Sequence, residues 1–170
     1  YVDAKGRHVT PGIIDCHSHT GISGGVNEGG QAITSECRIG DVTNPDATNW
    51  YQQLAGGVTC VNNLHGSANA IGGQSQTNKI RWGCAKPDDM HFENAMPGIK
   101  FALGENPRRA NGGDGSRYPA TRMGVEMIIR DRFTAASEYL AARGTPGFRR
   151  DFELEPLAEI LEGKRLVHSH

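Results

Sequence analysis

The chain has 170 residues, a formal net charge of -1 at pH 7, 36% hydrophobic residues and 23 glycines. This length suffices for one domain with a core, and the near-neutral charge argues against a nucleic-acid or anionic-membrane surface. No apolar run approaches the roughly 20 residues that a membrane-spanning helix needs. The 4 cysteines lack Cys-x-x-Cys spacing, so a disulfide scaffold is not expected.

The first nine residues predict a strand, a turn at 4–7 and a short return. The chain begins without Met inside a strand-turn pattern, and it stops inside another strand pattern. We therefore expect it to be a fragment of a longer polypeptide.

A His-x-His motif closes the first strong strand signal. Residues 12–16 form a short apolar, β-branched run behind Pro11, which predicts a buried strand. Side chains alternate along a strand, so His17 and His19 point to the same side. Neutral imidazole is a common ligand for zinc and its neighbours, so the pair predicts a metal site.

The remaining elements follow from composition and periodicity. Segments 20–49, 67–78 and 105–120 are rich in Gly and polar residues and predict loops, and segment 86–94 predicts an exposed charged stretch. An apolar stripe behind Thr121 as a cap predicts a helix to about residue 143. The other expectations are helices at 46–55 and 155–161 and strands at 58–64, 79–82, 98–103 and from 164 onwards.

Strands that alternate with helical segments predict an α/β fold with parallel pairing through crossovers. In such folds, the loops at the carboxyl ends of the strands carry the site. The chemically interesting residues all lie near such ends: His17, His19, His65, Lys100, Glu105, His168 and His170. We therefore expect these residues, although far apart in sequence, to lie close together at the carboxyl ends of the strands.

These motifs together resemble the amidohydrolase superfamily. The motif Pro-Gly-Ile-Ile-Asp-Cys-His-Ser-His is followed by a Gly-Val-Thr strand, a lysine-bearing strand and Leu-Val-His-Ser-His. The pattern of motifs along the chain is most similar to that of the imidazolonepropionase and dipeptidase-like branch of the superfamily. This resemblance implies a partial (β/α)8 TIM-type barrel of about the first five strands, spanning residues 10–170. Residues 1–9 would then be the remnant of a small N-terminal β-sandwich.

The resemblance also implies a set of metal ligands. His17 and His19 match the first-strand ligands of the more buried metal. Lys100 matches a lysine that is carboxylated in binuclear members and bridges two metals, and Glu105 is the competing ligand. His168 matches the ligand of a second metal, and His170 is the alternative.

Three residues have a weaker expected role in substrate binding: His65, Asn106 and His170. Members of the superfamily also need a further histidine and a catalytic aspartate from later strands. Neither is expected in this chain, so the resemblance implies no catalytic residue here and an inactive fragment.

The implied activity is metal-dependent hydrolysis of carbon–nitrogen bonds other than peptide bonds, such as an amide or lactam. The alternatives are a mononuclear deaminase-type amidohydrolase and a non-catalytic metal-binding domain. The expected cofactor is a divalent metal, with zinc as the default and one or two ions. The expected partner is a small-molecule substrate, without nucleic acid or membrane. A homo-oligomer of the full-length protein stays open, and the cytoplasm is the favoured compartment.

Overall fold

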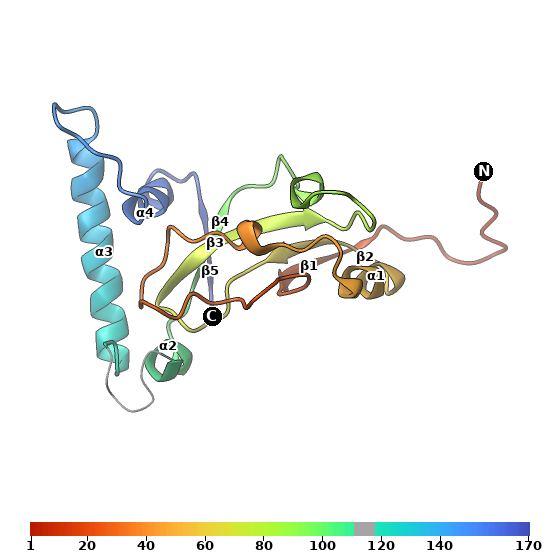
Figure 1. Ribbon diagram of the computed structural model, residues 1–170, viewed down its shortest axis with the longest axis horizontal. Coiled ribbons are helices and arrows are strands. Elements are labelled where there is room, and N and C mark those ends of the chain that lie inside the picture. Colours follow the sequence, from red (N-terminus) through yellow and green to blue (C-terminus); the bar gives the residue numbers. More distant parts are fainter. Residues whose placement is uncertain (111–117) are drawn as a thin grey trace.

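The computed structural model describes residues 1–110 and 118–170 (Figure 1). In chain order, its strands, α-helices and 3-10 helices are β1 Ile13–Ser18, η1 Ile39–Val42, α1 Thr48–Ala55, β2 Val58–Asn63, β3 Ile71–Lys79, η2 Pro87–Met90, β4 Gly98–Phe101, α2 Glu105–Ala110, α3 Arg122–Ala142, α4 Leu154–Leu161 and β5 Leu166–Ser169. No helix of the described part combines the length and apolar character needed to cross a membrane.

The strands form one sheet in the order β1-β2-β3-β4-β5. Strand β1 pairs parallel with β2 and β4 pairs parallel with β5, whereas β3 is antiparallel to both of its neighbours. Four strands therefore run in one direction, and their carboxyl ends share one edge of the sheet. The predicted α/β class is confirmed, but the expectation of purely parallel pairing is wrong at β3.

The sheet is strongly curled. Asn62 on β2 and His168 on β5 are separated by two intervening strands, yet Asn62 Nδ2 lies 3.3 Å from His168 Nε2. Neighbouring strands are about 4.8 Å apart, so three flat spacings would separate these residues by roughly 14 Å. Side chains from β2 and β5 meet only because the sheet bends round on itself, as in part of a barrel.

The convex face of the sheet is covered by helices. One core joins β3 and β4 to α3 and α4, with α3 standing along one side of the sheet in Figure 1. Its buried members are Ile33, Ile71, Ile99, Phe101, Ala136 and Leu157. A second core lies under α1 and buries Trp50, Val61, Ile80 and Met90. The helices thus leave the concave face and the carboxyl edge free for polar groups.

Local sequence signals account for most of the helices. The predicted long helix is α3, and Thr121 caps it by accepting a hydrogen bond from the Gly124 amide at 3.1 Å. The helices predicted at 46–55 and 155–161 are α1 and α4. The strands predicted at 58–64 and 98–103 are β2 and β4. Periodicity and capping are local properties, so they are legible in the sequence.

Strand β3 was not predicted. Segment 67–78 predicted a loop and 79–82 a strand, but the strand is Ile71–Lys79. Its sequence is mostly Gly, Gln, Ser and Asn, residues without strong strand propensity. Pairing on both edges and close packing select the strand: a Cβ at Gly73 would lie 2.1 Å from His65 Nε2. Only glycine allows this approach.

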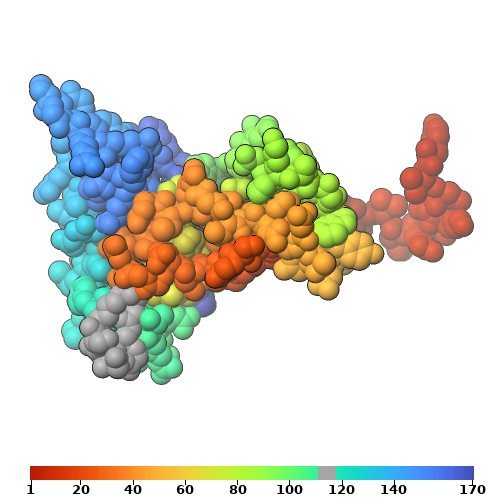
Figure 2. Space-filling view, in the orientation of Figure 1, coloured from red at the N-terminus to blue at the C-terminus, as the bar shows by residue number. Residues whose placement is uncertain are grey.

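Residues 1–9 and the strand β1 that follows them also differ from expectation. Residues 1–9 contain a turn but no strand, and they project from the body of the molecule (Figure 2). A strand needs hydrogen bonds to a neighbouring strand, whereas the hydrogen bonds described for these residues lie within the segment, such as that from the Arg7 amide to the Ala4 carbonyl at 2.9 Å. Strand β1 forms as predicted but is not buried: Ile13 and Ile14 are 56% and 70% exposed, because β1 is an edge strand.

The segment predicted as loop 105–120 contains helix α2 at Glu105–Ala110. The part of that prediction at 111–117 lies outside the described residues. Segment 86–94 is largely exposed as predicted, but it includes η2 and the fully buried Met90, which anchors it to the second core.

Candidate metal centre at the carboxyl edge of the sheet

Histidines from the first and last strands meet a buried lysine at the carboxyl edge. The His17 and His19 rings have centroids 5.3 Å apart at 84°, and the His17 and His170 rings are 6.3 Å apart. Lys100 Nζ lies 3.5 Å from His17 Nε2. His17, His19, Lys100 and His170 are therefore neighbours, although they come from β1 and its end, from β4 and from the end of β5.

Two successive backbone carbonyls after β2 orient this cluster. The Leu64 carbonyl is 2.8 Å from His19 Nδ1, and the His65 carbonyl accepts a hydrogen bond from Lys100 Nζ at 3.3 Å. A carbonyl oxygen only accepts, so the proton of His19 is placed on Nδ1. The lone pair of Nε2 is then free for a ligand, an arrangement typical of metal-binding histidines.

His168 lies beside Lys100 in the register of β4 and β5. Asn62 Nδ2 is 3.3 Å from His168 Nε2, so the lone pair of that nitrogen accepts the amide hydrogen. A Cβ at Gly98 would lie 2.7 Å from the same Nε2, so only glycine leaves room for the ring. His170 is placed further out, with Nδ1 2.5 Å from Ser67 Oγ.

Glu105 and Asn106 lie in a different environment from the buried cluster of histidines and Lys100. Glu105 is the first residue of α2 and forms ion pairs with Arg108 at 3.3 Å and Arg109 at 2.7 Å. Its side chain is 48% exposed, and Asn106 is also exposed. Between the two candidates for the strand-four ligand, the structure places Lys100 against His17 and pairs Glu105 with arginines of its own helix.

Burial lowers the pKa of three basic groups of the cluster, Lys100, His17 and His168. Lys100 is 1% exposed, and its burial lowers its pKa. Burial lowers the pKa of His17, with Lys100 and His19 adding to the effect, and burial and Lys100 lower the pKa of His168. Neutral imidazole is the form that binds metals, so the environment prepares these side chains for ligation.

His65 has the largest resolved shift. Burial, followed by the nearby His19 and Lys100, lowers its pKa from 6.5 to about 4. Its side chain is 5% exposed, and its Nδ1 has no hydrogen-bond partner among the described residues. His65 is therefore a neutral, buried imidazole with unused hydrogen-bonding capacity.

This shift predicts acid sensitivity. The unfolded chain takes up a proton at His65 near pH 6.5 and the folded chain only near pH 4, so stability is lost as the pH falls through this window. Between pH 7 and pH 4, we expect the metal-free protein to lose about 3 kcal/mol of unfolding free energy through His65. Denaturant melts of wild type and His65→Gln would measure it. Equal losses in the two proteins would contradict the assignment.

The donor set fits a divalent metal in its chemistry. It comprises neutral histidines, a buried amine without an ion pair in the described structure, and a ring spacing of 5.3 Å between His17 and His19. Two imidazoles that bind one ion at about 2.1 Å have centroids roughly 5 Å apart. The described residues contain no group of three or more His, Cys, Asp or Glu arranged to hold a metal.

Several residues of this region carried no sequence signal of their own. Asn62 and Ser67 contact the two C-terminal histidines, and the Leu64 carbonyl orients His19. Asn62 lies two residues before Leu64 and so on the same face of its strand, and this spacing was the one sequence signal that pointed to Asn62. Backbone acceptors have no residue-specific signature.

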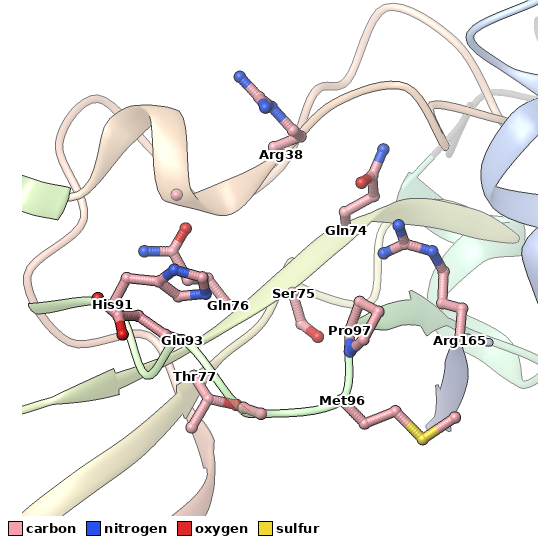
Figure 3. Close-up of a pocket in the computed structure, with 12 residues that line it drawn as sticks. Arg38, Gln74, Ser75, Gln76, Thr77, His91, Glu93, Met96, Pro97 and Arg165 are labelled. Carbon is pink, nitrogen blue, oxygen red and sulfur yellow. The ribbon is translucent and has the colours of Figure 1, made fainter.

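A separate hollow lies away from this cluster. Figure 3 shows it between β3, the segment around Arg38 and the start of β5, with Gln74, Gln76 and Arg165 on its walls. Its volume is about 340 Å³. The Arg165 guanidinium there is already bound to Glu159 and to the Gly98 carbonyl. None of the predicted site residues lines this hollow.

The histidines and the buried lysine thus lie together at the carboxyl edge of a curled α/β sheet. No family model matches the chain. It is 32% identical over 203 residues to amidohydrolase TasK of Hapsidospora irregularis, across 99% of this chain and 20% of that protein. It also superposes on the crystal structure of an amidohydrolase from Thermotoga maritima MSB8, with a TM-score of 0.85 and 32% identity.

That superposition covers 95% of this chain and 45% of the Thermotoga maritima chain. The chain is thus similar in both sequence and fold to proteins named amidohydrolase, and the predicted partial barrel is confirmed. The chain spans less than half the length of either relative.

Proposed function

We propose that the protein to which this chain belongs is a metal-dependent hydrolase of carbon–nitrogen bonds other than peptide bonds. The observation that carries the proposal is the contact of Lys100, 1% exposed, with His17 at 3.5 Å. Burying an amine without an ion pair costs stability, so a buried lysine of this kind calls for a functional explanation. Similarity to proteins named amidohydrolase supports the hydrolase class.

Each residue has a definable task in this proposal. His17 and His19 would hold one divalent ion, with His19 fixed by the Leu64 carbonyl. Lys100, as a carbamate, would offer two anionic oxygens beside His17, and His168 would complete a second position after release from Asn62. A bound divalent ion supplies a strong nucleophile at neutral pH and polarises the scissile carbonyl. His170 and Ser67 lie further out, where they would contact substrate.

One observation favours the mononuclear deaminase-type alternative. Lys100 Nζ donates a hydrogen bond to the His65 carbonyl at 3.3 Å, a role that an unmodified amine can fill. In that case Lys100 would be structural, and the histidines alone would bind one ion.

The test uses the full-length protein on a panel of lactams, cyclic imides, N-acyl amino acids and aminated nucleobases. We expect hydrolysis of an amide-type bond that a chelator abolishes and zinc or manganese restores. Ammonia release from a nucleobase would indicate the deaminase alternative. Hydrolysis that survives complete metal removal would refute the proposal, and stoichiometric metal binding without turnover would support the non-catalytic alternative.

A further inference from the structure

Two hydroxyl residues alternate with the histidines of the His-x-His motif and lie behind the metal centre. His17 and His19 are exposed, whereas Ser18 and Thr20 are only 5% and 8% exposed. Successive side chains of an extended segment point to opposite sides, so the motif presents its imidazoles to the carboxyl edge and its hydroxyl groups to the protein interior. The placement of His19 therefore depends on the contacts that hold Ser18 and Thr20.

The end of β2 holds the backbone on both sides of His19. The Leu64 amide donates a hydrogen bond to the Ser18 carbonyl at 3.0 Å, and Asn63 Nδ2 donates one to the Thr20 carbonyl at 3.0 Å. The His19 ring itself is bound through Nδ1 to the Leu64 carbonyl at 2.8 Å. The backbone before His19, the backbone after it and its ring are thus each attached to Asn63 or Leu64.

Side-chain hydrogen bonds also connect Thr20 to helix α1. Gln53 Nε2 donates to Thr20 Oγ1 at 2.9 Å, and Ser18 Oγ donates to the same oxygen at 3.0 Å. The Thr20 amide donates to Ser18 Oγ at 3.2 Å, a local bond typical of serine and threonine. The chain that follows β1 is therefore attached to α1 as well as to β2.

Asn63, the last residue of β2, is fully buried, yet only part of its amide is used. Its side chain is 0% exposed, and its Oδ1 has no hydrogen-bond partner within the described ranges. A buried polar atom without a partner lowers stability and calls for an explanation. Leucine has a similar branched shape and would avoid this cost. The bond from Nδ2 to the Thr20 carbonyl is what the amide provides here and leucine cannot.

We propose that Asn63 is a positioning residue for His19. Through the Thr20 carbonyl, Asn63 keeps the His19 ring on the Leu64 carbonyl, so that the lone pair of Nε2 stays available at the carboxyl edge. The inference rests on the proposed hydrolase function, because it takes His19 as a metal ligand. Partners that orient a ligating side chain typically contribute about 10–100-fold to metal affinity. Asn63 would thus strengthen the binding of the ion held by His17 and His19.

The test compares Asn63→Leu with wild type in the full-length protein. Competition with a chromophoric chelator measures zinc affinity. In the metal-free protein, ¹⁵N NMR at a pH where the ring is neutral follows the His19 nitrogens, and His19→Gln identifies their signals. We expect zinc to bind about tenfold more weakly and the form of His19 protonated at Nδ1 to lose population.

Asn78→Leu is the matched control. Asn78 is also 0% exposed and also has one unpaired side-chain atom, Nδ2, in the part of the chain that the structure describes. It lies on β3 opposite Val61, and its Oδ1 accepts a hydrogen bond from Gln76. Zinc affinity and the His19 signals should stay as in wild type in this variant. The melting temperature of metal-free Asn63→Leu should fall no further than that of the control.

The outcomes separate the inference from the proposed function. Unchanged zinc affinity in Asn63→Leu, unchanged His19 signals, or equal weakening in the control would overturn the positioning role, while metal-dependent hydrolysis would still stand. Weaker zinc binding in Asn63→Leu would support that role even if the wild type hydrolyses nothing, a result that refutes the hydrolase. Should Asn63→Leu not fold, Gln53→Met decides, because Gln53 is partly exposed on α1 and its loss frees Thr20 Oγ1. Weaker zinc binding in Gln53→Met would support the inference, and wild-type affinity would overturn it.

Discussion

Replacing Lys100 by methionine in the full-length protein is expected to stabilise the metal-free fold and to abolish function. Lys100 is 1% exposed, and burial lowers its pKa. Methionine has a similar volume without the buried amine, so the unfolding free energy should rise by roughly 1 kcal/mol. Hydrolysis should fall by about 100-fold or more, since the metal shell loses a member.

Thermal melts measure the change in stability, and metal analysis shows whether the loss of hydrolysis comes with a loss of bound metal. With a carbamate at Lys100, added bicarbonate should raise the metal content of wild type and leave Lys100→Met unchanged. The matched control is Lys164→Met, because Lys164 is 64% exposed in its side chain and pairs with Glu162 outside the site. Wild-type metal content in Lys100→Met would exclude Lys100 as a ligand and leave it a structural role.

Replacing Gly73 by alanine is expected to disrupt the site from the neighbouring strand. The new Cβ would lie 2.1 Å from His65 Nε2 and 2.6 Å from the Cys37 carbonyl oxygen. Both distances are far below van der Waals contact, and the second involves backbone. We expect a loss of about 1–3 kcal/mol in stability and a displacement of His65, whose carbonyl orients Lys100.

The variant Gly104→Ala is the control, because a Cβ at Gly104 would meet nothing within 4 Å. It should keep both stability and metal content. Combining Gly73→Ala with His65→Ala should recover part of the stability, because the ring clash disappears but the Cys37 contact remains. A fully stable Gly73→Ala protein would show that the close packing of β3 on His65 is dispensable.

The sequence predicted the local elements and the principal site residues with different success. The His-x-His motif at 17–19 and the cap at Thr121 are short-range patterns, and both lie where the patterns placed them. The role of His17, His19, Lys100 and His168 as ligands stays a prediction. The sequence favoured Lys100 over Glu105 as the strand-four ligand. In the fold Lys100 lies against His17 and Glu105 pairs with Arg109, and the identity of the ligand stays a prediction.

Strand β3 shows why part of the fold was not predictable. Its run of glycine and polar residues favours a loop by composition, and it becomes a strand only because β2 and β4 pair with it on both sides. The same strand provides the space for the His65 ring at Gly73. Strand propensity is a property of one segment of the sequence, whereas the formation of β3 depends on three segments, β2, β3 and β4.

The sequence by itself determined the chemical groups, namely histidines and a lysine at strand ends, and the resemblance that they create. Only the tertiary structure decided which of them meet. His17 and Lys100 are 83 positions apart, and Asn62 and His168 are 106 apart. Their contacts depend on the curl of the sheet and on the Leu64 and His65 carbonyls. Curvature and backbone acceptors arise from packing across the whole chain, so no local pattern of residues encodes them.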